Sequence, residues 1–363
     1  MEGPRSPSEN ELPGVLEFLN KKLRNEASWS IAAEYPTAFS SNNLHNMRII
    51  ADEGHVLSHA VLKPLIIKSP HVIFKVGAIG SVVTDDQHRG QGLSTKVISD
   101  CLKLATEQSC DIAILWTDLF DFYRRMGFEL AGSEISFVVE ENYDIPPINL
   151  RFSTDTKVSP DAIYRLYSAH SVNSVRTIEE TRKFLSIPQT KVYTAWESNG
   201  QLAAYAIEGK GVDLGGYIHE WGGSVSKLMA LFSFIRAHKN QPYTIICPRH
   251  AQNLIQQLQQ KPVTMNQGFL GMIKLVNFDQ LSAKIKRAFR AEGVADIVLE
   301  KHPQHFVFGV GQDLFTINNE TDMVRLLFGP VDYRALGMFK EETIQKLEKV
   351  LPLNLWIWGW DSI

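Results

Sequence analysis

A loop that contains two glycines is the part of this sequence best suited to binding an anion. It runs from Gln87 to Gly92, between a short apolar run and a stretch in which apolar residues recur at helical spacing. That spacing predicts an amphipathic helix from about Ser94 to Ser109. In such a strand–loop–helix unit the glycines let backbone N–H groups converge, and the helix dipole adds partial positive charge. We therefore predict an anion site at the amides of residues 88–94, beside the positive charge of Arg89.

The spacing of this loop excludes two common phosphate-binding motifs. No Gly-Lys-Ser/Thr follows, as a Walker loop requires, and the third glycine of a dinucleotide fingerprint is missing. The pattern Gln87-x-x-Gly90-x-Gly92 instead resembles the pyrophosphate loop of the GNAT acetyltransferases. An apolar run at 111–116 and then Phe122-Tyr123-x-x-x-Gly127-Phe128 follow it in the order typical of that family.

The resemblance implies that acetyl-CoA is the cofactor. Its expected contacts are Ser81, Val82, Val83, Arg89, Gly90, Gln91, Gly92, Leu93 and Ser94.

Acetyl transfer from a thioester to an amine sets three requirements. The thioester carbonyl must be polarised, the amine must be neutral when it attacks, and the departing thiolate must be protonated. We expect the strand at Val82 and Val83 to offer a free N–H to the thioester oxygen. Tyr123 is the candidate acid, because it lies one helical turn before Gly127 and a phenol with a free pKa of about 10 can protonate a thiolate. The GNAT resemblance implies the same role.

The chain is too long for one compact core, so several domains are expected. The first, residues 1–146, combines a helix at 11–24 with strands at 47–52, 55–63 and 64–74, and a strand at 135–140 closes it. The second, residues 147–277, repeats this order without the glycine-loop spacing, so we expect a GNAT-like domain with no cofactor site. The third, residues 278–363, resembles a sterol-carrier-like domain. The predicted fold class is α+β: two tandem GNAT-like mixed-sheet domains and a small sterol-carrier-like α/β domain.

This order of domains resembles the enhanced-intracellular-survival family, whose best-known members acetylate aminoglycosides at amines. In that family the carboxylate at the end of the chain reaches back into the first domain, which implies Ile363 as the base here. The final run from Leu353 is apolar on both alternating faces and predicts a buried strand. Asp361 is a competing carboxylate, and the sequence leaves both open.

Composition narrows the classes of partner. A net charge of −3 argues against nucleic acid, which needs a basic surface. The three cysteines have no metal-ligand spacing, so no metal site is predicted. Without the apolar segment of a signal peptide, or an apolar run of about 18 residues, we expect a cytoplasmic protein that crosses no membrane. The sequence is compatible with a homo-oligomer but does not determine one.

The predicted function is acetyl-CoA-dependent N-acetylation, by direct attack, of a primary amine on a small molecule or peptide. The alternative is a non-catalytic CoA- or lipid-binding interaction protein built on tandem GNAT folds.

Overall fold

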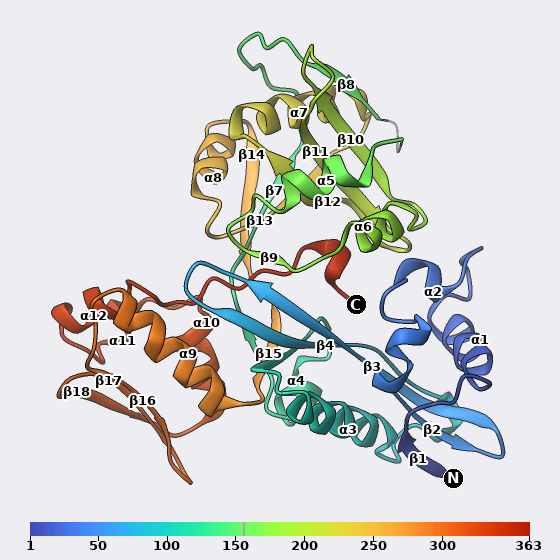
Figure 1. Cartoon of the computed structure of the whole chain (residues 1–363), viewed down its shortest axis with the longest axis vertical. Helices are drawn as coiled ribbons and strands as arrows, with labels where there is room; N and C mark the ends of the chain where they lie inside the picture. Colours follow the sequence, from blue (N-terminus) through green and yellow to red (C-terminus); the bar gives the residue numbers. More distant parts are fainter. Residues whose placement is uncertain (155–156) are drawn as a thin grey trace.

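The computed structural model describes residues 1–154 and 157–363, and within them the chain forms three β-sheets with helices packed on their faces (Figure 1). The fold is α+β, and the first two sheets mix parallel and antiparallel strands.

The first sheet has eight strands and carries the glycine loop. Its order is β1 (Glu2–Arg5), β2 (Met47–Asp52), β3 (His55–Lys68), β4 (Ile73–Thr84), β5 (Ile112–Leu115), β15 (Gly271–Leu275) and β6 (Glu129–Ala131), with β9 (Asn173–Ser174) paired to β3. Its helices are α1 (Leu12–Leu23), α2 (Ile31–Glu34), η1 (Ser41–Asn46), η2 (Asp86–His88), α3 (Leu93–Glu107) and α4 (Phe120–Arg124).

Helices α1 and α3 cover opposite faces of this sheet. The apolar side of α3 packs with Ile50, Leu62 and Ile79, whereas α1 packs with Ile49 and Val61. Because successive side chains of a strand point to opposite faces, one set of strands supplies two separate cores. The expected helix after the loop is confirmed as α3.

The second sheet has seven strands. Its order is β14 (Val263–Gly268), β7 (Glu134–Val139), β13 (Tyr243–Pro248), β12 (Asp213–Gly223), β11 (Leu202–Lys210), β10 (Lys191–Trp196) and β8 (Arg151–Ser153). Its helices are α5 (Pro160–Tyr167), α6 (Ile178–Leu185), α7 (Val225–His238) and α8 (Gln252–Gln259).

The two large sheets exchange a strand, which corrects one prediction. Strand β7 was expected to close the first domain, but it pairs with β13 and β14 of the second sheet. In return β15, from the second segment, lies between β5 and β6 of the first sheet. Hydrogen bonding therefore crosses the predicted boundary at residues 146 and 147 in both directions, and neither sheet is complete from one segment alone.

Strand β3 corrects a second expectation. Residues 55–63 and 64–74 were expected to form two strands, but β3 continues to Lys68 and the chain reverses at 69–72. Proline has no N–H to donate, and Pro64 is tolerated because the edge of β3 away from β4 has no ladder partner there within the described chain. The ladder with β2 ends at Val61, and the ladder with β9 begins at Ile67.

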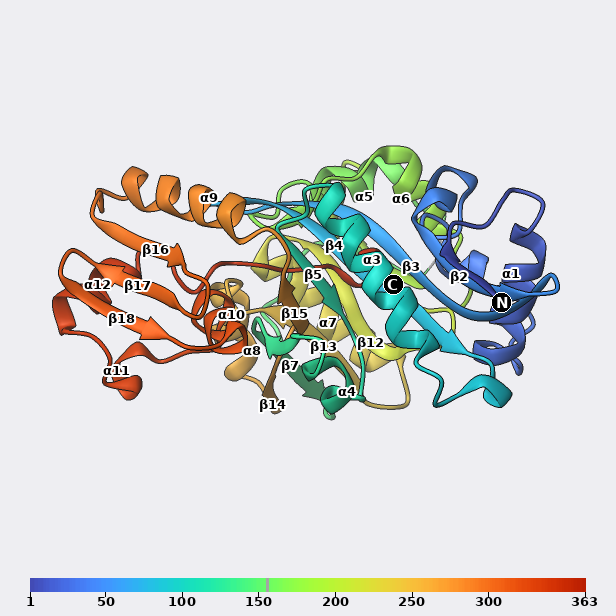
Figure 2. The same ribbon diagram turned by 90° about the horizontal axis from the view of Figure 1, so that it is seen from below.

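The third unit contains the smallest sheet. It comprises β16 (Ile297–Lys301), β17 (Phe306–Val310) and β18 (Asp313–Ile317), with helices α9 (Phe278–Ala291), α10 (Glu320–Phe328), α11 (Tyr333–Leu336) and α12 (Glu341–Leu347). Figure 2 shows this unit at the opposite end of the molecule from α1. The strands and helices agree with the expected layout, and the sterol-carrier likeness stays a prediction.

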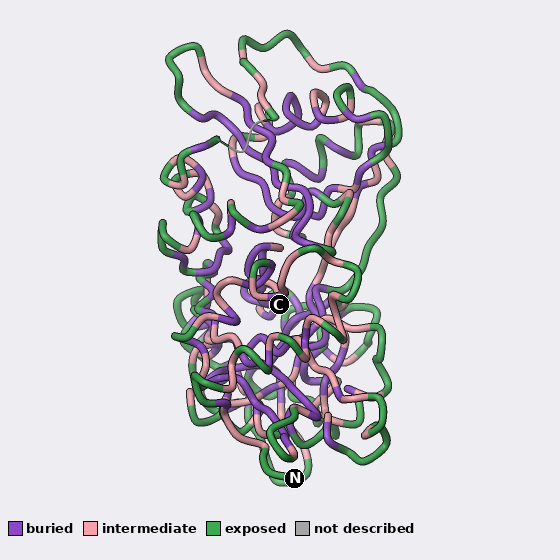
Figure 3. The backbone as a smooth tube through the Cα atoms, turned by 90° about the vertical axis from the view of Figure 1, so that its right-hand side faces the viewer, coloured by how far each residue is buried: buried purple, intermediate pink, exposed green. Residues whose placement is uncertain are grey.

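The C-terminal segment is buried, as expected, but it is not a strand. Residues 353–358 have no ladder partner among the described residues, and only η3 (Gly359–Asp361) is regular. Side-chain hydrogen bonds, and not a β-ladder, hold this segment, and its buried side chains Trp356, Trp358 and Trp360 anchor it in the core. In Figure 3 the C-terminus lies in the middle of the molecule, among buried segments.

No helix in the described ranges combines the length and the apolar character needed to cross a bilayer.

Candidate active site

Strand β4 separates from its parallel neighbour at the site. The ladder between β4 and β5 covers Val76 to Ala78 only, while β4 continues to Thr84 beside β3. The register against β3 shifts at Ser81, whose φ of 49° lies in the left-handed region. The end of β4 is thus bulged, and among the described residues its edge toward β5 makes no ladder hydrogen bonds. Backbone N–H groups on this edge are therefore free to donate to a ligand.

A buried histidine holds this bulge. The ring Nδ1 of His59 lies 2.9 Å from the carbonyl oxygen of Ser81, so Nδ1 carries the proton and donates it. Burial lowers the pKa of His59 to about 4, and the ring is therefore neutral near pH 7. This contact was not predictable from the sequence, because it depends on the register of β3 against β4.

The glycine loop has the geometry of a cradle for an anion. Gly90 and Gly92 have φ values of 78° and 73°, and a Cβ built at either one meets no atom within 4 Å. Gly92 is the N-cap of α3, and no side chain of residues 1–154 or 157–363 caps this end, so the first N–H groups of the helix remain available. Open space, free donors and a helix N-terminus fit the diphosphate of a nucleotide cofactor.

Charged and hydroxyl side chains around the loop are already paired. Lys22 lies 3.0 Å from Asp85 and 2.6 Å from Asp86, and Arg89 lies 2.7 Å from Asp86. Lys22 is the main reason that the pKa of Asp85 falls to about 2, which makes this carboxylate a poor base. The hydroxyl of Ser94 lies 2.7 Å from that of Thr84 and ties α3 to β4. Leu93 is buried and could contact a cofactor only through its backbone.

Tyr123 lies on α4, in the core on the α3 side of the first sheet. Its ring meets Phe122 and Phe128 edge to face, with centroids 4.9 and 5.9 Å away. Burial raises its pKa to about 12, so the phenol keeps its proton near pH 7. Val82 packs against the same cluster, which connects Tyr123 to the bulged end of β4.

The chain ends at the other face of the same strand. A Cβ built at Gly80 would lie 2.8 Å from the carboxyl carbon of Ile363, so the terminal carboxylate contacts β4 directly. Ile363 and Val83 both pack against the core on the α1 side. The candidate base and the candidate acid thus lie on opposite sides of the bulged strand.

A cavity of about 550 Å³ opens beside Ile363, between the two large sheets and the C-terminal segment. Ser81, Val82 and Ile363 line it, whereas Tyr123 and the glycine loop do not. The sequence did not predict the wall residues that the second sheet supplies, among them Lys210, His219 and Glu134. Of these three residues, Lys210 is the one that the sequence could have indicated, because it is a charged residue at the end of an apolar strand.

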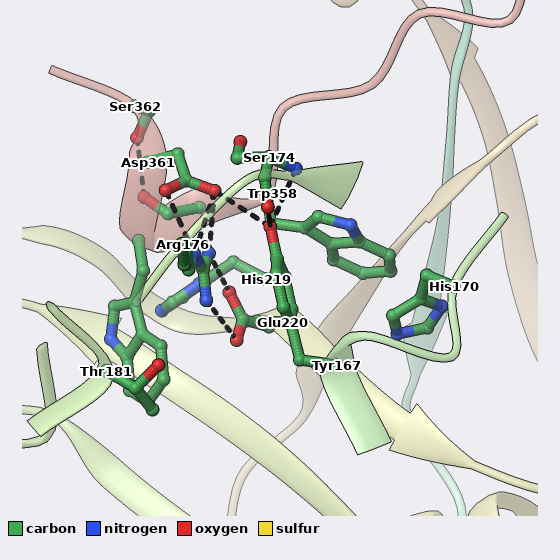
Figure 4. A network of polar contacts seen from close by, with 12 residues as sticks. Tyr167, His170, Ser174, Arg176, Thr181, His219, Glu220, Trp358, Asp361 and Ser362 are labelled. Carbon is green, nitrogen blue, oxygen red and sulfur yellow. Dashed lines mark hydrogen bonds and ion pairs between the residues drawn. The ribbon is translucent and has the colours of Figure 1, made fainter. Parts of the chain in front are cut away.

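The competing carboxylate is engaged elsewhere. Arg176 donates to Asp361 over 2.7 to 3.1 Å, and the hydroxyl of Tyr167 donates to it over 3.2 Å (Figure 4). Asp361 is buried and does not line the cavity. Of the two candidates that the sequence left open, Ile363 is the one that reaches the cavity.

Comparison with known proteins agrees with this geometry. Residues 4–131 match a family model described as "Acetyltransferase (GNAT) domain". The match covers about a third of the chain, and the fold of this segment is GNAT-like. No curated protein sequence matches the chain.

Solved structures of similar fold span the whole chain. A GCN5-related N-acetyltransferase from Anabaena variabilis has a TM-score of 0.67 at 16% identity and covers 99% of each chain. A conserved protein from Enterococcus faecalis, described as a probable N-acyltransferase, has a TM-score of 0.65 at 14% identity and 99% coverage of both. Eis1 from Mycobacterium abscessus has a TM-score of 0.63 at 11% identity and 100% coverage of both. At these identities the likeness is one of fold.

Proposed function

We propose that this protein is an acetyl-CoA-dependent N-acetyltransferase that acetylates a primary amine of a small molecule or peptide by direct attack. The observation that carries the proposal is the open N-terminus of α3, formed by two left-handed glycines beside a β4 that has separated from β5. Donors for a diphosphate and donors for a carbonyl oxygen meet there, within the GNAT domain.

Bound acetyl-CoA would supply the thioester. The residues of this chain would bind the cofactor, polarise its carbonyl group and transfer the protons. The amides of 90–94 and the side chain of Arg89 would hold the diphosphate. An N–H of Val82 or Val83 would donate to the carbonyl oxygen, where negative charge develops as the amine attacks. The carboxylate of Ile363 would accept the proton that the amine releases, and the phenol of Tyr123 would protonate the departing sulfur.

The placement of acid and base supports this division of roles. Ile363 lines the cavity and Tyr123 does not. An acceptor in the cavity would therefore meet the carboxylate first, while the sulfur would leave toward the phenol. One C–N bond forms, one C–S bond breaks, and one proton moves at each side. None of the three cysteines suits an acyl-enzyme route, because all three are buried and burial raises the pKa of each thiol.

A thiol-release assay with acetyl-CoA and a panel of small amines and peptides tests the proposal. We expect release that depends on both substrates and an acetylated amine in the product mass. Calorimetry with CoA provides the second arm. Tight CoA binding without release for any amine would favour the non-catalytic CoA-binding alternative. A protein that ignores CoA would refute both.

A further inference from the structure

Lys210 is a buried lysine of the second sheet whose side-chain ammonium donates hydrogen bonds to residues 359–362. It is 1% exposed, at the last position of β11. Its ammonium donates to the carbonyl oxygens of Gly359 at 2.9 Å, Trp360 at 3.4 Å and Ser362, and lies 3.2 Å from the Ser362 hydroxyl. Within the described residues, no acceptor outside 359–362 shares this ammonium.

The buried ammonium of Lys210 depends on hydrogen-bond acceptors from the C-terminal segment. A lysine that loses its water needs acceptors in the protein, or its charged form becomes unfavourable. Burial lowers the pKa of Lys210 to about 7, and the charge of Asp361 partly opposes that shift. If residues 359–363 left, the ammonium would keep none of its present acceptors. The lysine and the C-terminal segment therefore stabilise each other.

The path of the segment is fixed from several sides. A Cβ at Gly359 would collide with the ring of His219, so the backbone runs directly against β12. One residue after Ser362, the chain ends at Gly80 of β4. The ammonium of Lys210 also lies 4.6 Å from the ring centre of Tyr35 in the first domain. A single side chain thus contacts both the first domain and the residue next to the terminal carboxylate.

A second anchor lies on the other side of the same turn. Arg176 bridges Asp361 and Glu220, with bonds to Glu220 of 2.9 and 2.7 Å (Figure 4). This anchor binds a side chain two residues before the terminus, whereas Lys210 binds the backbone up to Ser362. Lys210 therefore has the more direct control over where the carboxylate of Ile363 lies.

We propose that Lys210 is a positioning residue of the second domain, which holds residues 359–362 so that the Ile363 carboxylate is fixed against Gly80 at the cavity. The inference rests on the proposed function for the role of that carboxylate. It makes the activity of the GNAT domain depend on a second domain that lacks the glycine-loop spacing. Because Lys210 acts through the carboxylate, it should affect the chemical step and leave the affinity for CoA unchanged.

Carboxypeptidase digestion followed by intact-mass spectrometry tests the positioning without any assay of activity. We expect the full-length protein to lose Ile363 slowly and Lys210→Met to lose it about tenfold faster, because cleavage follows the population of the open form. Lys191→Met is the matched control, since this lysine lies in the same sheet but pairs with Glu208, so its digestion should match the wild type.

Kinetics test the role in the reaction. We expect kcat of Lys210→Met to fall about 100-fold, the size of effect that a displacement of 1 Å produces, with KM for acetyl-CoA unchanged. Asp361→Asn is a second, milder variant that keeps the shape of the side chain, and it should release Ile363 and lower kcat to a smaller degree. Circular dichroism and CoA titration of each variant show whether the fold persists.

Two results would overturn the proposal. One is a terminus that is no more accessible in either variant than in the wild type, and the other is a released terminus with kcat unchanged. A wild-type protein that transfers acetyl to no amine would instead refute the proposed function. The digestion would still decide whether Lys210 holds the terminus.

Discussion

Single residues on the two sides of β4 carry the chemistry proposed here. Tyr123 is buried and keeps its proton, while Ile363 presents a carboxylate to the cavity. Their separate environments suit opposite directions of proton transfer, because an acid must be protonated and a base ionised at the same pH.

Replacement of Tyr123 by Phe removes the proton donor and keeps the ring. We expect turnover to fall by about 10²- to 10⁴-fold, the usual contribution of a general acid, with little change in affinity for CoA. Steady-state kinetics and a CoA titration provide the two numbers. Tyr217→Phe, at an exposed tyrosine of the second sheet, is the control. Wild-type turnover in Tyr123→Phe would remove this residue from the mechanism.

The terminal carboxylate can be moved or neutralised separately. An extension of a few residues after Ile363 displaces it, and a C-terminal carboxamide made by protein ligation removes its charge at constant length. We expect both forms to stay folded, because Lys210 and Arg176 still hold the preceding residues, and to lose most of their turnover. Thiol release measures the loss. Full activity in the carboxamide form would show that another group is the base.

At the scale of elements, the helix α3 and the bulged end of β4 are the working parts. A helix N-terminus without a side-chain cap is left for a ligand to satisfy, and the strand offers a free edge beside it. Neither feature stabilises the isolated protein, which is typical of functional sites.

Gly92→Ala tests the helix N-terminus. The added Cβ meets no protein atom but enters the space proposed for the diphosphate, so we expect the Kd for CoA to rise about tenfold or more. The positive φ also costs about 1 kcal/mol. Gly200→Ala is a matched control, because Gly200 has a φ of 81° and equally open surroundings in the second domain. Equal loss of CoA affinity in both variants would contradict the assignment of the cradle.

The bulge of β4 predicts a dependence of stability on pH. His59 is neutral when folded because its pKa is lowered to about 4, whereas in the unfolded chain a histidine titrates at about 6.5. As the pH falls from about 6.5 to about 4, His59 binds a proton in the unfolded chain but stays neutral in the folded protein. The free energy of unfolding thus drops by about 1.4 kcal/mol per pH unit for this residue.

His59→Gln keeps a donor for Ser81 and removes the titration. We expect its unfolding midpoint to fall less steeply than that of the wild type between pH 6.5 and 4.5. Thermal unfolding monitored by circular dichroism gives both curves, and the other titrating groups are common to the two proteins. Parallel curves would show that His59 is not held neutral.

At the scale of the whole molecule, the first two segments are joined by exchanged strands. Strand β15 completes the first sheet, and β7 completes the second sheet. Each segment is thus part of the other's core, which links the stability of the candidate site to a strand far along the chain, where Leu275 pairs with Ile112.

Hydrogen exchange can detect this link. Ile273→Ala removes a fully buried side chain of β15, and we expect a loss of about 2–5 kcal/mol, with faster exchange in β5 and β6 of the first sheet. Ile245→Ala, at an equally buried position of β13, is the control and should loosen the second sheet instead. Unchanged protection of β5 in Ile273→Ala would contradict the exchange of strands.

The sequence by itself determined the features that depend on local pattern. The glycine loop, the helix after it and the Phe122-Tyr123 pair all lie within one continuous stretch, so spacing and periodicity were enough to identify them. The burial of the last residues also followed from their composition, although their state as irregular backbone did not.

Only the tertiary structure decided which distant residues meet. The exchange of β7 and β15 was not predictable from the sequence. The local pattern of either strand is compatible with either sheet, and the packing of the two sheets decides which strand joins which. The same reason applies to Lys210, whose acceptors lie about 150 residues away, and to the contact between Ile363 and Gly80. Local pattern fixes which face of an element is apolar, but the pairing of faces is a property of the whole chain.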